Sequence, residues 1–218
     1  ARETMRQGDV VASMLRKTLE VFRTDDRKLL KDVERMDDVV DRLHESIKHY
    51  VIRVSREQLD DTDSRRTIDV LTFTTNLEHI GDIIDKNLME LAAKKIKHSL
   101  RFSDEGFAEI ARMHERLLDN LALALNVFMS SDVRMARQLL GEKIRFRELE
   151  RSASDSHIDR LALGKPETLA TSSLHLDVIR DLKRINSHLT AVAYPILDAA
   201  GELSQTRLKT ADEKNGEE

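Results

Sequence analysis

The sequence predicts an all-α protein made of two tandem three-helix bundles, and three observations lead to that prediction. Glycine and proline, the strongest breakers of helices and strands, number only 7 and 2 in 218 residues, too few for an all-β fold. Charged residues make up 35% of the chain, hydrophobic residues 40% and aromatic residues 4%, a mixture typical of amphipathic helices. Long segments also repeat apolar residues in steps of three and four, the period of a helix with one buried face.

Five breaks in this periodicity divide the chain into six helical segments. Each break is rich in residues that cap helices or end them. The breaks fall at residues 24–26, 55–64, 99–103, 130–132 and 164–172. Segments of roughly 20 to 35 residues joined by short connections are typical of long antiparallel bundles.

The apolar faces can be followed from one segment to the next. The first segment ends on the apolar pair Val21 and Phe22. The second has the clearest seam, formed by Leu29, Val33, Met36, Val40, Leu43, Ile47, Tyr50 and Val54. The third presents Leu77, Ile80, Ile84 and Leu88, and the fourth presents Phe107, Ile110, His114, Leu117, Leu121, Leu125 and Phe128. After Glu202 the chain turns polar, and residues 204–218 are predicted to form a frayed tail.

The chain also resembles itself. Residues 21–26 and 127–132 share a Val-Phe pair followed by a polar turn and Asp, at an offset of 106 residues. The run Leu-Glu-His-Ile-Gly-Asp at 77–82 aligns with Leu-Lys-Arg-Ile-Asn-Ser at 182–187. We therefore divide the chain into a first half, residues 1–102, and a second half, residues 103–203, each a three-helix bundle.

Composition excludes several classes of protein. The formal net charge of −4 argues against binding of nucleic acid or an anionic membrane through overall charge. The chain has no cysteine, so it has no disulfide framework, thiolate zinc site or cysteine nucleophile. Its most apolar stretch, residues 117–129, is interrupted by Asp119, Asn120 and Asn126, so we expect no insertion of this segment into a bilayer.

Two acidic pairs are the first candidate site. Asp37 and Asp41 lie one turn apart on the second helix, and Glu78 and Asp82 lie one turn apart on the third, on a stripe that also carries Asp85. Carboxylates at this spacing repel each other unless a cation, a proton or water screens them. Oxygen ligands on facing helices are how bundles hold iron, manganese or magnesium. The alternative is a solvated helix flank, with Lys48, Lys86 or His79 as partners.

The second half reverses this charge. The counterparts of Asp37 and Asp41 are Lys143 and Arg147, and the counterparts of the third-helix pair are Lys183 and Ser187. A metal cluster of the same design is not expected there, because cationic side chains repel the ion. Lys143, Arg147, Lys183 and Arg184 are instead candidates for binding an anion or an acidic partner.

Further basic residues of this half could join that surface: His157, Arg160, His175, Arg180 and His188. The alternative is local neutralisation by Glu142, Glu148, Glu150, Asp177 and Asp181. Catalytic signatures are missing, since the chain has no Gly-rich phosphate loop, nucleophile elbow, His-Glu-x-x-His helix or Glu-x-x-His pair. The sequence therefore nominates no reaction, and we expect a protein that is not an enzyme.

Six helices in two similar halves, with Asp37-x-x-x-Asp41 on the second and Glu78-His-Ile-Gly-Asp82 on the third, resemble the PhoU proteins. These are helical regulators of phosphate uptake whose E(D)-x-x-x-D motifs bind clusters of iron or other metals. The resemblance covers nearly the whole chain and implies a PhoU-like six-helix fold. It also implies iron, or another divalent or trivalent metal ion, at Asp37, Asp41, Glu78 and Asp82.

The second half resembles a narrower group. Residues 142–161 and the run from His175 to His188 look like the PhoU-like domain of bacterial sodium-dependent phosphate cotransporters. That likeness implies a place on the cytoplasmic side of the inner membrane, with a membrane transport domain upstream in the same chain. The departure from the acidic motif at Lys183 and Ser187 sets a second metal cluster in doubt.

Three hypotheses follow. The first is a non-catalytic cytoplasmic regulatory domain of a sodium/phosphate cotransporter, which controls phosphate uptake through contacts of its helix faces with the transport domain and, as a further expectation, forms a homodimer. The second is a free-standing PhoU-type adaptor that relays phosphate status to an ATP-driven transporter and a sensor kinase. The third is a carboxylate-bridged metalloenzyme or metal store, which would need histidine ligands at a spacing that this chain lacks.

Overall fold

The structure is a computed structural model that describes residues 1–56 and 59–203, so the tail predicted at 204–218 lies outside it. All regular elements of the described part are helical, which confirms the all-α prediction. In chain order they are α1 (Arg2–Thr24), α2 (Arg27–Val54), α3 (Asp61–Asp82), the π-helix η1 (Ile83–Met89), α4 (Glu90–Lys97), α5 (Asp104–Ser130), α6 (Val133–Ala162), α7 (Pro166–Thr190) and α8 (Ala193–Ala199). Because α3, η1 and α4 follow one another without a break, they form one rod.

Four helices begin where a short polar side chain accepts a hydrogen bond from the first turn. The caps are Asp26 for α2, Asp60 for α3, Ser103 for α5 and Asp132 for α6. Each cap of this kind contributes about 1 kcal/mol, because it satisfies backbone N–H groups that otherwise lack a partner. The predicted breaks at 24–26, 99–103 and 130–132 therefore coincide with real helix boundaries.

Two predicted breaks are too long. Helix α3 already begins at Asp61, and α7 begins at Pro166, so most of residues 164–172 are helical. Proline fits the first turn of a helix because its ring presets the backbone and its missing N–H has no partner there anyway. The Ser- and Thr-rich stretch that follows stays helical, with Thr171 donating to the carbonyl of Glu167 at 2.7 Å.

The apolar seams build one continuous core. In α5 the predicted seam is buried from Ile110 to Phe128, and within it His114 donates from Nε2 to the carbonyl of Leu15 at 2.6 Å. Burial lowers the pKa of His114, so this ring stays neutral. In α2 the seam is buried at Val33 and Val40, but Tyr50 is 58% exposed, because the end of α2 borders a pocket.

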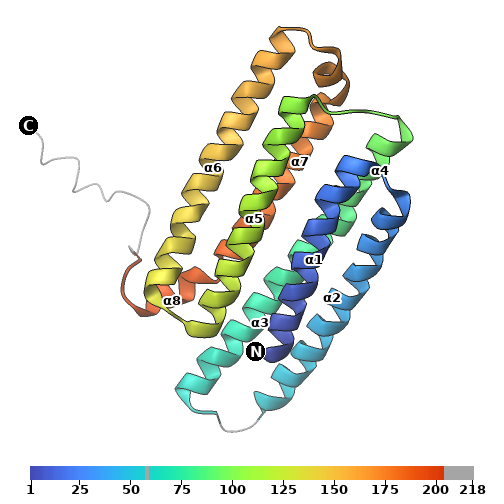
Figure 1. Ribbon diagram of the computed structural model, residues 1–218. Coiled ribbons are helices and arrows are strands. Elements are labelled where there is room, and N and C mark those ends of the chain that lie inside the picture. The colour runs from blue at the N-terminus through green and yellow to red at the C-terminus, as the bar shows by residue number, and fades with distance from the viewer. Residues whose placement is uncertain (57–58, 204–218) are drawn as a thin grey trace, which may run out of the picture.

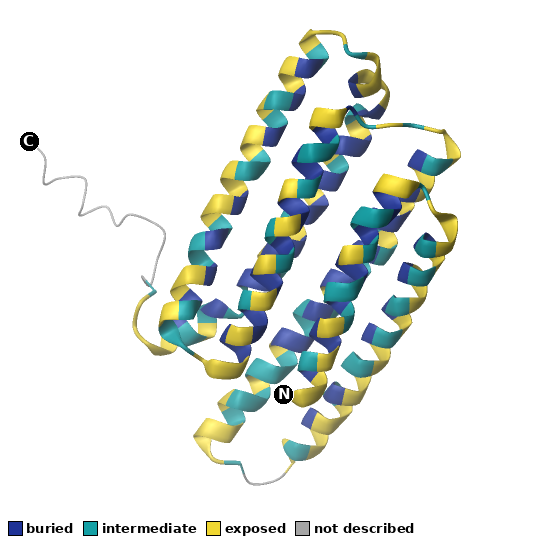
Figure 2. Ribbon diagram, viewed as in Figure 1, coloured by how far each residue is buried: buried dark blue, intermediate teal, exposed yellow. Residues whose placement is uncertain are grey.

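The two halves lie side by side with their long helices roughly parallel to one another (Figure 1). Helices α1 and α5 run in opposite directions, and α5 begins at the end of the molecule where α1 finishes. Buried residues gather on the helix sides that face one another, and the outer sides are exposed (Figure 2). Phe73 of the first half stacks on Phe128 of the second half with ring centroids 4.8 Å apart, so the halves share their core.

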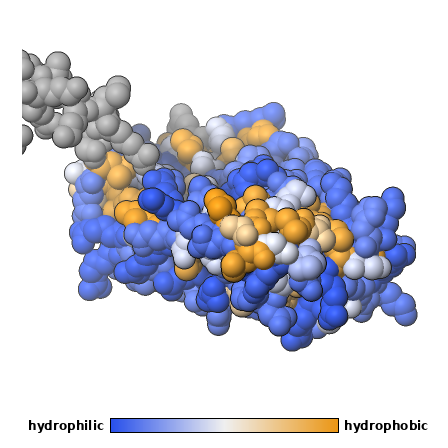
Figure 3. Space-filling view, turned by 90° about the horizontal axis from the view of Figure 1, so that it is seen from above, coloured by the Kyte–Doolittle hydropathy of each residue, from blue (hydrophilic) through white to orange (hydrophobic). Residues whose placement is uncertain are grey.

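Within the described ranges, no helix is both long and apolar enough to cross a membrane. The surface seen from above is mainly hydrophilic and carries an apolar patch near its middle (Figure 3). Nine large hydrophobic side chains of the described part are exposed, and five of them belong to the α6–α7 region: Ile144, Ile158, Leu163, Leu169 and Leu176.

Candidate functional site

Asp37 is the buried member of the acidic cluster. Its residue is only 6% exposed, and its Oδ1 atom has no hydrogen-bond partner among the described residues. Gly81 of α3 lies directly opposite: a Cβ atom at that position would be 2.5 Å from Asp37 Oδ1 and 3.3 Å from Val40 Cγ1. Glycine at 81 therefore allows α2 and α3 to approach each other closely around a carboxylate.

The charges around Asp37 act against its ionisation. Burial raises its pKa, and the carboxylates of Asp41, Asp85 and Asp82 raise it further, to about 7. The ammonium group of Lys86 opposes this shift. Near neutral pH the Asp37 carboxyl is therefore close to evenly divided between its protonated and ionised forms.

The π-helix η1 places a further carboxylate, that of Asp85, at this site. Its wider turn carries Asp85, whose pKa is raised by burial and by the nearby charge of Glu34, with Lys86 acting in the opposite direction. Lys86 itself forms an ion pair with Asp82. Asp85 lies on the acidic stripe that the sequence displays, but no sequence signal indicated a π-helix. Such segments are rare and are frequent at functional sites.

The structure brings part of the predicted quartet together. The carboxylates of Asp41 and Asp82 are close enough to Asp37 to raise its pKa. Glu78 instead lies beside His79, with Glu78 Oε2 and His79 Nε2 3.6 Å apart. In residues 1–56 and 59–203, no group of three or more His, Asp or Glu side chains is arranged so that it could hold a metal ion. A buried oxygen without a partner, among other carboxylates, does suit an oxygen-seeking cation. The metal site thus stays a prediction.

Most of the four basic residues predicted to bind an anion in the second half already have a partner within the chain. Lys183 Nζ donates to Glu150 at 2.8 Å, and Lys143 Nζ donates to the hydroxyl of Tyr194 at 2.9 Å. Arg147 is exposed. Three of the predicted local acids, Glu142, Asp177 and Asp181, likewise accept ion pairs from arginines. An incoming anion would have to compete with these partners, and the anion-binding role of the four basic residues stays a prediction.

Arg184 belongs to a contact that joins the two halves. It donates to Asp181 Oδ1 at 2.9 Å, and Asp181 is almost completely buried. The amide of Asn87, on η1 of the first half, donates to both carboxylate oxygens of Asp181 at 3.2 Å. The same π-helix therefore carries Asp85 at the acidic cluster and Asn87 at the interface between the halves.

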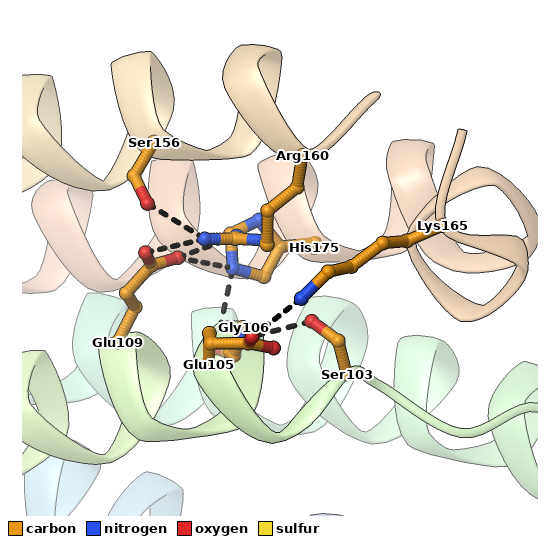
Figure 4. A network of polar contacts seen from close by, with 8 residues as sticks. All are labelled: Ser103, Glu105, Gly106, Glu109, Ser156, Arg160, Lys165 and His175. Carbon is orange, nitrogen blue, oxygen red and sulfur yellow. Dashed lines mark hydrogen bonds and ion pairs between the residues drawn. The ribbon is translucent and has the colours of Figure 1, made fainter. Parts of the chain in front are cut away.

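A buried ionic network was not foreseen from the sequence. Arg160 of α6 forms a two-pronged ion pair with Glu109 of α5, at 2.7 and 2.8 Å, and both residues are buried (Figure 4). His175 of α7 also contacts Glu109, with Nε2 3.2 Å from both Glu109 Oε2 and the carbonyl of Gly106. The ring of His157 stacks on His175 with centroids 4.7 Å apart.

The network fixes the charge of its members. Burial alone would raise the pKa of Glu109, but hydrogen bonds from Arg160 and Ser156 outweigh it and lower that pKa, so Glu109 stays ionised. Burial and the neighbouring His157 lower the pKa of His175 to about 4, so this ring is neutral above that pH. Two nitrogens, Arg160 Nε and His175 Nδ1, have no hydrogen-bond partner within the described ranges.

The sequence groups Arg160, His175 and His157 with the basic surface of the second half. The structure corrects this prediction, because all three residues are buried: Arg160 and His175 contact Glu109, and His157 stacks on His175. Glu109 had not been singled out, since its partners come from two other helices. A charged residue beside the apolar seam of α5 was the only hint in the chain.

A family model and a relative of known name both match most of this chain. The family model for the PhoU domain matches residues 4–91 and 110–196. The chain is 37% identical over 202 residues to "Putative inorganic phosphate export protein YjbB" of Escherichia coli K12; the match covers 93% of this chain and 37% of that relative. The chain thus spans little more than a third of the length of this relative.

Solved structures agree on the fold. The PhoU crystal structure from Pseudomonas aeruginosa superimposes with a TM-score of 0.81 at 17% identity and covers 93% of this chain and 95% of that one. The phosphate transport system regulatory protein PhoU from Streptococcus pneumoniae gives a TM-score of 0.79 at 16% identity, with 94% and 95% coverage. At these identities the likeness concerns the fold alone.

Proposed function

Because the chain belongs to the PhoU domain family, with two matched segments that together span most of its length, we propose that it is a regulatory domain of a phosphate transporter. The domain is non-catalytic, as PhoU regulatory proteins are. It acts at the cytoplasmic face of the bacterial inner membrane, where contacts of its helix faces adjust a membrane transport domain. In this proposal residues 1–102 and 103–203 are the two PhoU units, and a homodimer is a further expectation.

One observation carries the proposal. The chain matches a relative named for phosphate export along 93% of its own length but spans only 37% of that relative. A domain that corresponds to one portion of a longer transport protein is well placed to regulate the remainder. The sequence resemblance implies control of sodium-coupled uptake, whereas the name of this relative concerns export, so the experiment must also decide the direction of transport.

The acidic cluster supports a sensing role for the first half. We expect Asp37, Asp41, Glu78 and Asp82 to hold iron or another divalent or trivalent metal ion, as the family resemblance implies. A bound cation would relieve the repulsion that raises the pKa of Asp37. It would also take over the role of the Lys86 ammonium beside Asp82, because both neutralise the same carboxylate.

The basic side of the second half supports a binding role. Lys143, Arg147, Lys183 and Arg184 would receive an anion or an acidic segment of the transport domain. Arg184 is tied through Asp181 to Asn87 of η1. A partner bound on this side can therefore influence the π-helix that carries Asp85, which gives the two halves a physical connection.

The test measures phosphate transport by cells that express the complete gene, with and without the segment that corresponds to residues 1–218. Influx and efflux of radiolabelled phosphate are followed at low and high external phosphate. We expect removal of the segment to abolish the response to phosphate level while transport protein remains in the membrane. Unchanged transport, regulation and assembly would rule out a regulatory domain.

A free-standing adaptor for an ATP-driven phosphate transporter and a sensor kinase is the second candidate. It is favoured by the PhoU chain of P. aeruginosa, 95% of which this chain covers, so the two chains are of similar extent. The genomic reading frame distinguishes the two candidates. Several apolar stretches of about 20 residues in the same frame support the transporter, and their absence supports the adaptor.

A further inference from the structure

A lysine side chain already neutralises part of the acidic cluster. The ammonium group of Lys86, on η1, donates to Asp82 Oδ1 and forms an ion pair with it. That hydrogen bond raises the pKa of Lys86, and the charges of Asp37 and Asp41 raise it further, so the group stays charged within the field of three carboxylates. In return Lys86 opposes the rise in the pKa of Asp37. Lys86 therefore does part of what a bound cation would do.

This ammonium group is held more loosely than a ligated metal ion. The side chain of Lys86 is 62% exposed and that of Asp82 is 32% exposed, so water competes for both charges and weakens the pair. A divalent cation carries twice the charge and is held by several oxygens at once. The buried oxygen of the cluster, Asp37 Oδ1, has no hydrogen-bond partner among the described residues. To free Asp82 as a second oxygen ligand beside Asp37, only the exposed pair with Lys86 has to break.

A second acidic surface lies beside Lys86. The lysine lines a surface pocket of about 410 Å³ whose other lining residues include Glu34, Asp38, Asp85 and Glu90. Burial raises the pKa of Asp85, the charge of Glu34 raises it further, and the ammonium group of Lys86 acts in the opposite direction. Because the side chain of Lys86 is a flexible stem of four carbons, a change of rotamer takes its ammonium group from Asp82 towards these acids.

The second half lacks both members of the ion pair. At the offset of 105 residues between the third helix and its counterpart, Asp82 corresponds to Ser187 and Lys86 corresponds to Ala191. The acid and the lysine are therefore present together in the half that carries the acidic cluster, and both are missing from the half in which the buried carboxylate has permanent partners.

We propose that Lys86 is a built-in competitor for a divalent metal ion at the acidic cluster. In the metal-free protein its ammonium group occupies Asp82, and it has to leave before that carboxylate can become a ligand. The displaced side chain turns towards Glu34 and Asp85 in the neighbouring pocket. Lys86 thereby sets the metal concentration at which the cluster fills. The inference rests on the cation site and the sensing role proposed above, and it adds the residue that regulates them.

The direct test titrates Mn²⁺ into chelator-treated protein by isothermal titration calorimetry. We expect Lys86→Met to bind Mn²⁺ about three- to tenfold more tightly than the wild type, because no ammonium group has to leave. Lys97→Met removes an equal charge from an exposed position of α4 and should change the affinity by less than about twofold. A Lys86→Met variant that binds Mn²⁺ no more tightly than the wild type would overturn the proposal.

Thermal unfolding shows whether the ammonium group leaves. Without metal, Lys86→Met should melt below the wild type, because it has lost the pair with Asp82. At one saturating Mn²⁺ concentration this gap should narrow, since the wild type has then lost the same pair. An unchanged gap would show that the pair persists beside the metal. A variant that melts above the wild type would show that Lys86 stays in place and only repels the ion. Either result contradicts displacement.

The outcomes separate this inference from the claims on which it rests. Equal binding of Mn²⁺ by the wild type and Lys86→Met would leave the cation site standing and refute the competitor role alone. If none of the three proteins takes up Mn²⁺, the cation site and the competitor role both fail. The regulation of a transporter is decided separately, by the transport experiment with and without the segment.

Discussion

The two halves share a scaffold but handle buried charge in opposite ways. In the first half Asp37 is buried with an oxygen that lacks a partner, and the charges around it are mainly of its own sign. In the second half Glu109 is equally buried but is held by Arg160 and His175. A carboxylate left unsatisfied stores repulsion that a cation or proton can relieve, whereas a paired carboxylate has no such need. The contrast supports the proposed sensing role of the first half, and it indicates that the buried charges of the second half serve its stability.

The largest expected effect comes from breaking the buried pair of the second half. Arg160→Met leaves Glu109 charged and buried without its two-pronged partner, which should cost on the order of 3–5 kcal/mol of unfolding free energy. Urea denaturation followed by circular dichroism measures this. Arg35→Met, which removes an exposed pair with Asp32, is the control and should cost less than about 1 kcal/mol. Equal costs for the two variants would show that the network does not stabilise the second half.

The ionisation of Asp37 should make the stability of the protein depend on pH, which tests the contrast between the two buried carboxylates. Its pKa is raised from 3.8 to about 7 on folding, so between these values the folded state holds a proton that the unfolded state has lost. Its stabilising contribution is complete at low pH and is lost as the pH rises through 7. Asp37→Asn should therefore match the wild type near pH 4 and be more stable above pH 7, by up to about 4 kcal/mol.

Thermal unfolding from pH 4 to 8 gives this difference in the metal-free protein. Asp38→Asn, at the exposed neighbouring position, provides the control and should show no such trend. If Asp37→Asn gained nothing above pH 7, the carboxyl would not be the buried, repelled group that the structure indicates.

His175 should give a dependence of the opposite sign. Burial lowers its pKa from 6.5 to about 4, so between these values the unfolded state takes up a proton that the folded state refuses. Stability from this group is complete above pH 6.5 and is lost as the pH falls towards 4, by up to about 3 kcal/mol. His175→Asn should flatten this acid limb of the stability curve, whereas His49→Asn, at an exposed position, should not. A steep limb that persists in His175→Asn would assign the loss to other groups.

Gly81 tests the close approach of α2 and α3 at the acidic cluster. In Gly81→Ala the added Cβ atom meets Asp37 Oδ1 at 2.5 Å, and the displacement should cost about 1–3 kcal/mol. Gly141→Ala is a matched control, because its Cβ atom meets nothing within 4 Å in the interior of α6. That change should stabilise the protein by roughly 0.5–1 kcal/mol through helix propensity alone. Two changes of the same sign in chemical denaturation would contradict the packing described at Gly81.

Much of the fold could be predicted from sequence because helical periodicity is a local signal. The seam of α5 and the breaks around Asp26 and Asp132 are read from residues a few positions apart, and the structure places them as expected. The start of α7 at Pro166 was missed, because its Ser and Thr residues suggest a loop when the proline cap is not weighed.

The candidate site was harder to predict from the sequence than the fold, since its key features depend on contacts between helices. The spacing of Asp37 and Asp41 was visible, but the burial of one and the exposure of the other depend on how α3 packs across α2 at Gly81. The π-helix that presents Asp85 has no known sequence signature, and the pair of Glu109 with Arg160 joins residues 51 positions apart.

The central claim is that the first half alone carries a cation site, and metal content tests it most directly. The protein is purified without chelator, and its iron, manganese and other metals are measured by elemental analysis against Asp37→Asn and against Lys183→Ala. We expect metal in stoichiometric amount in the wild type and in Lys183→Ala, and its loss in Asp37→Asn. A wild type that holds no more metal than Asp37→Asn would contradict the account.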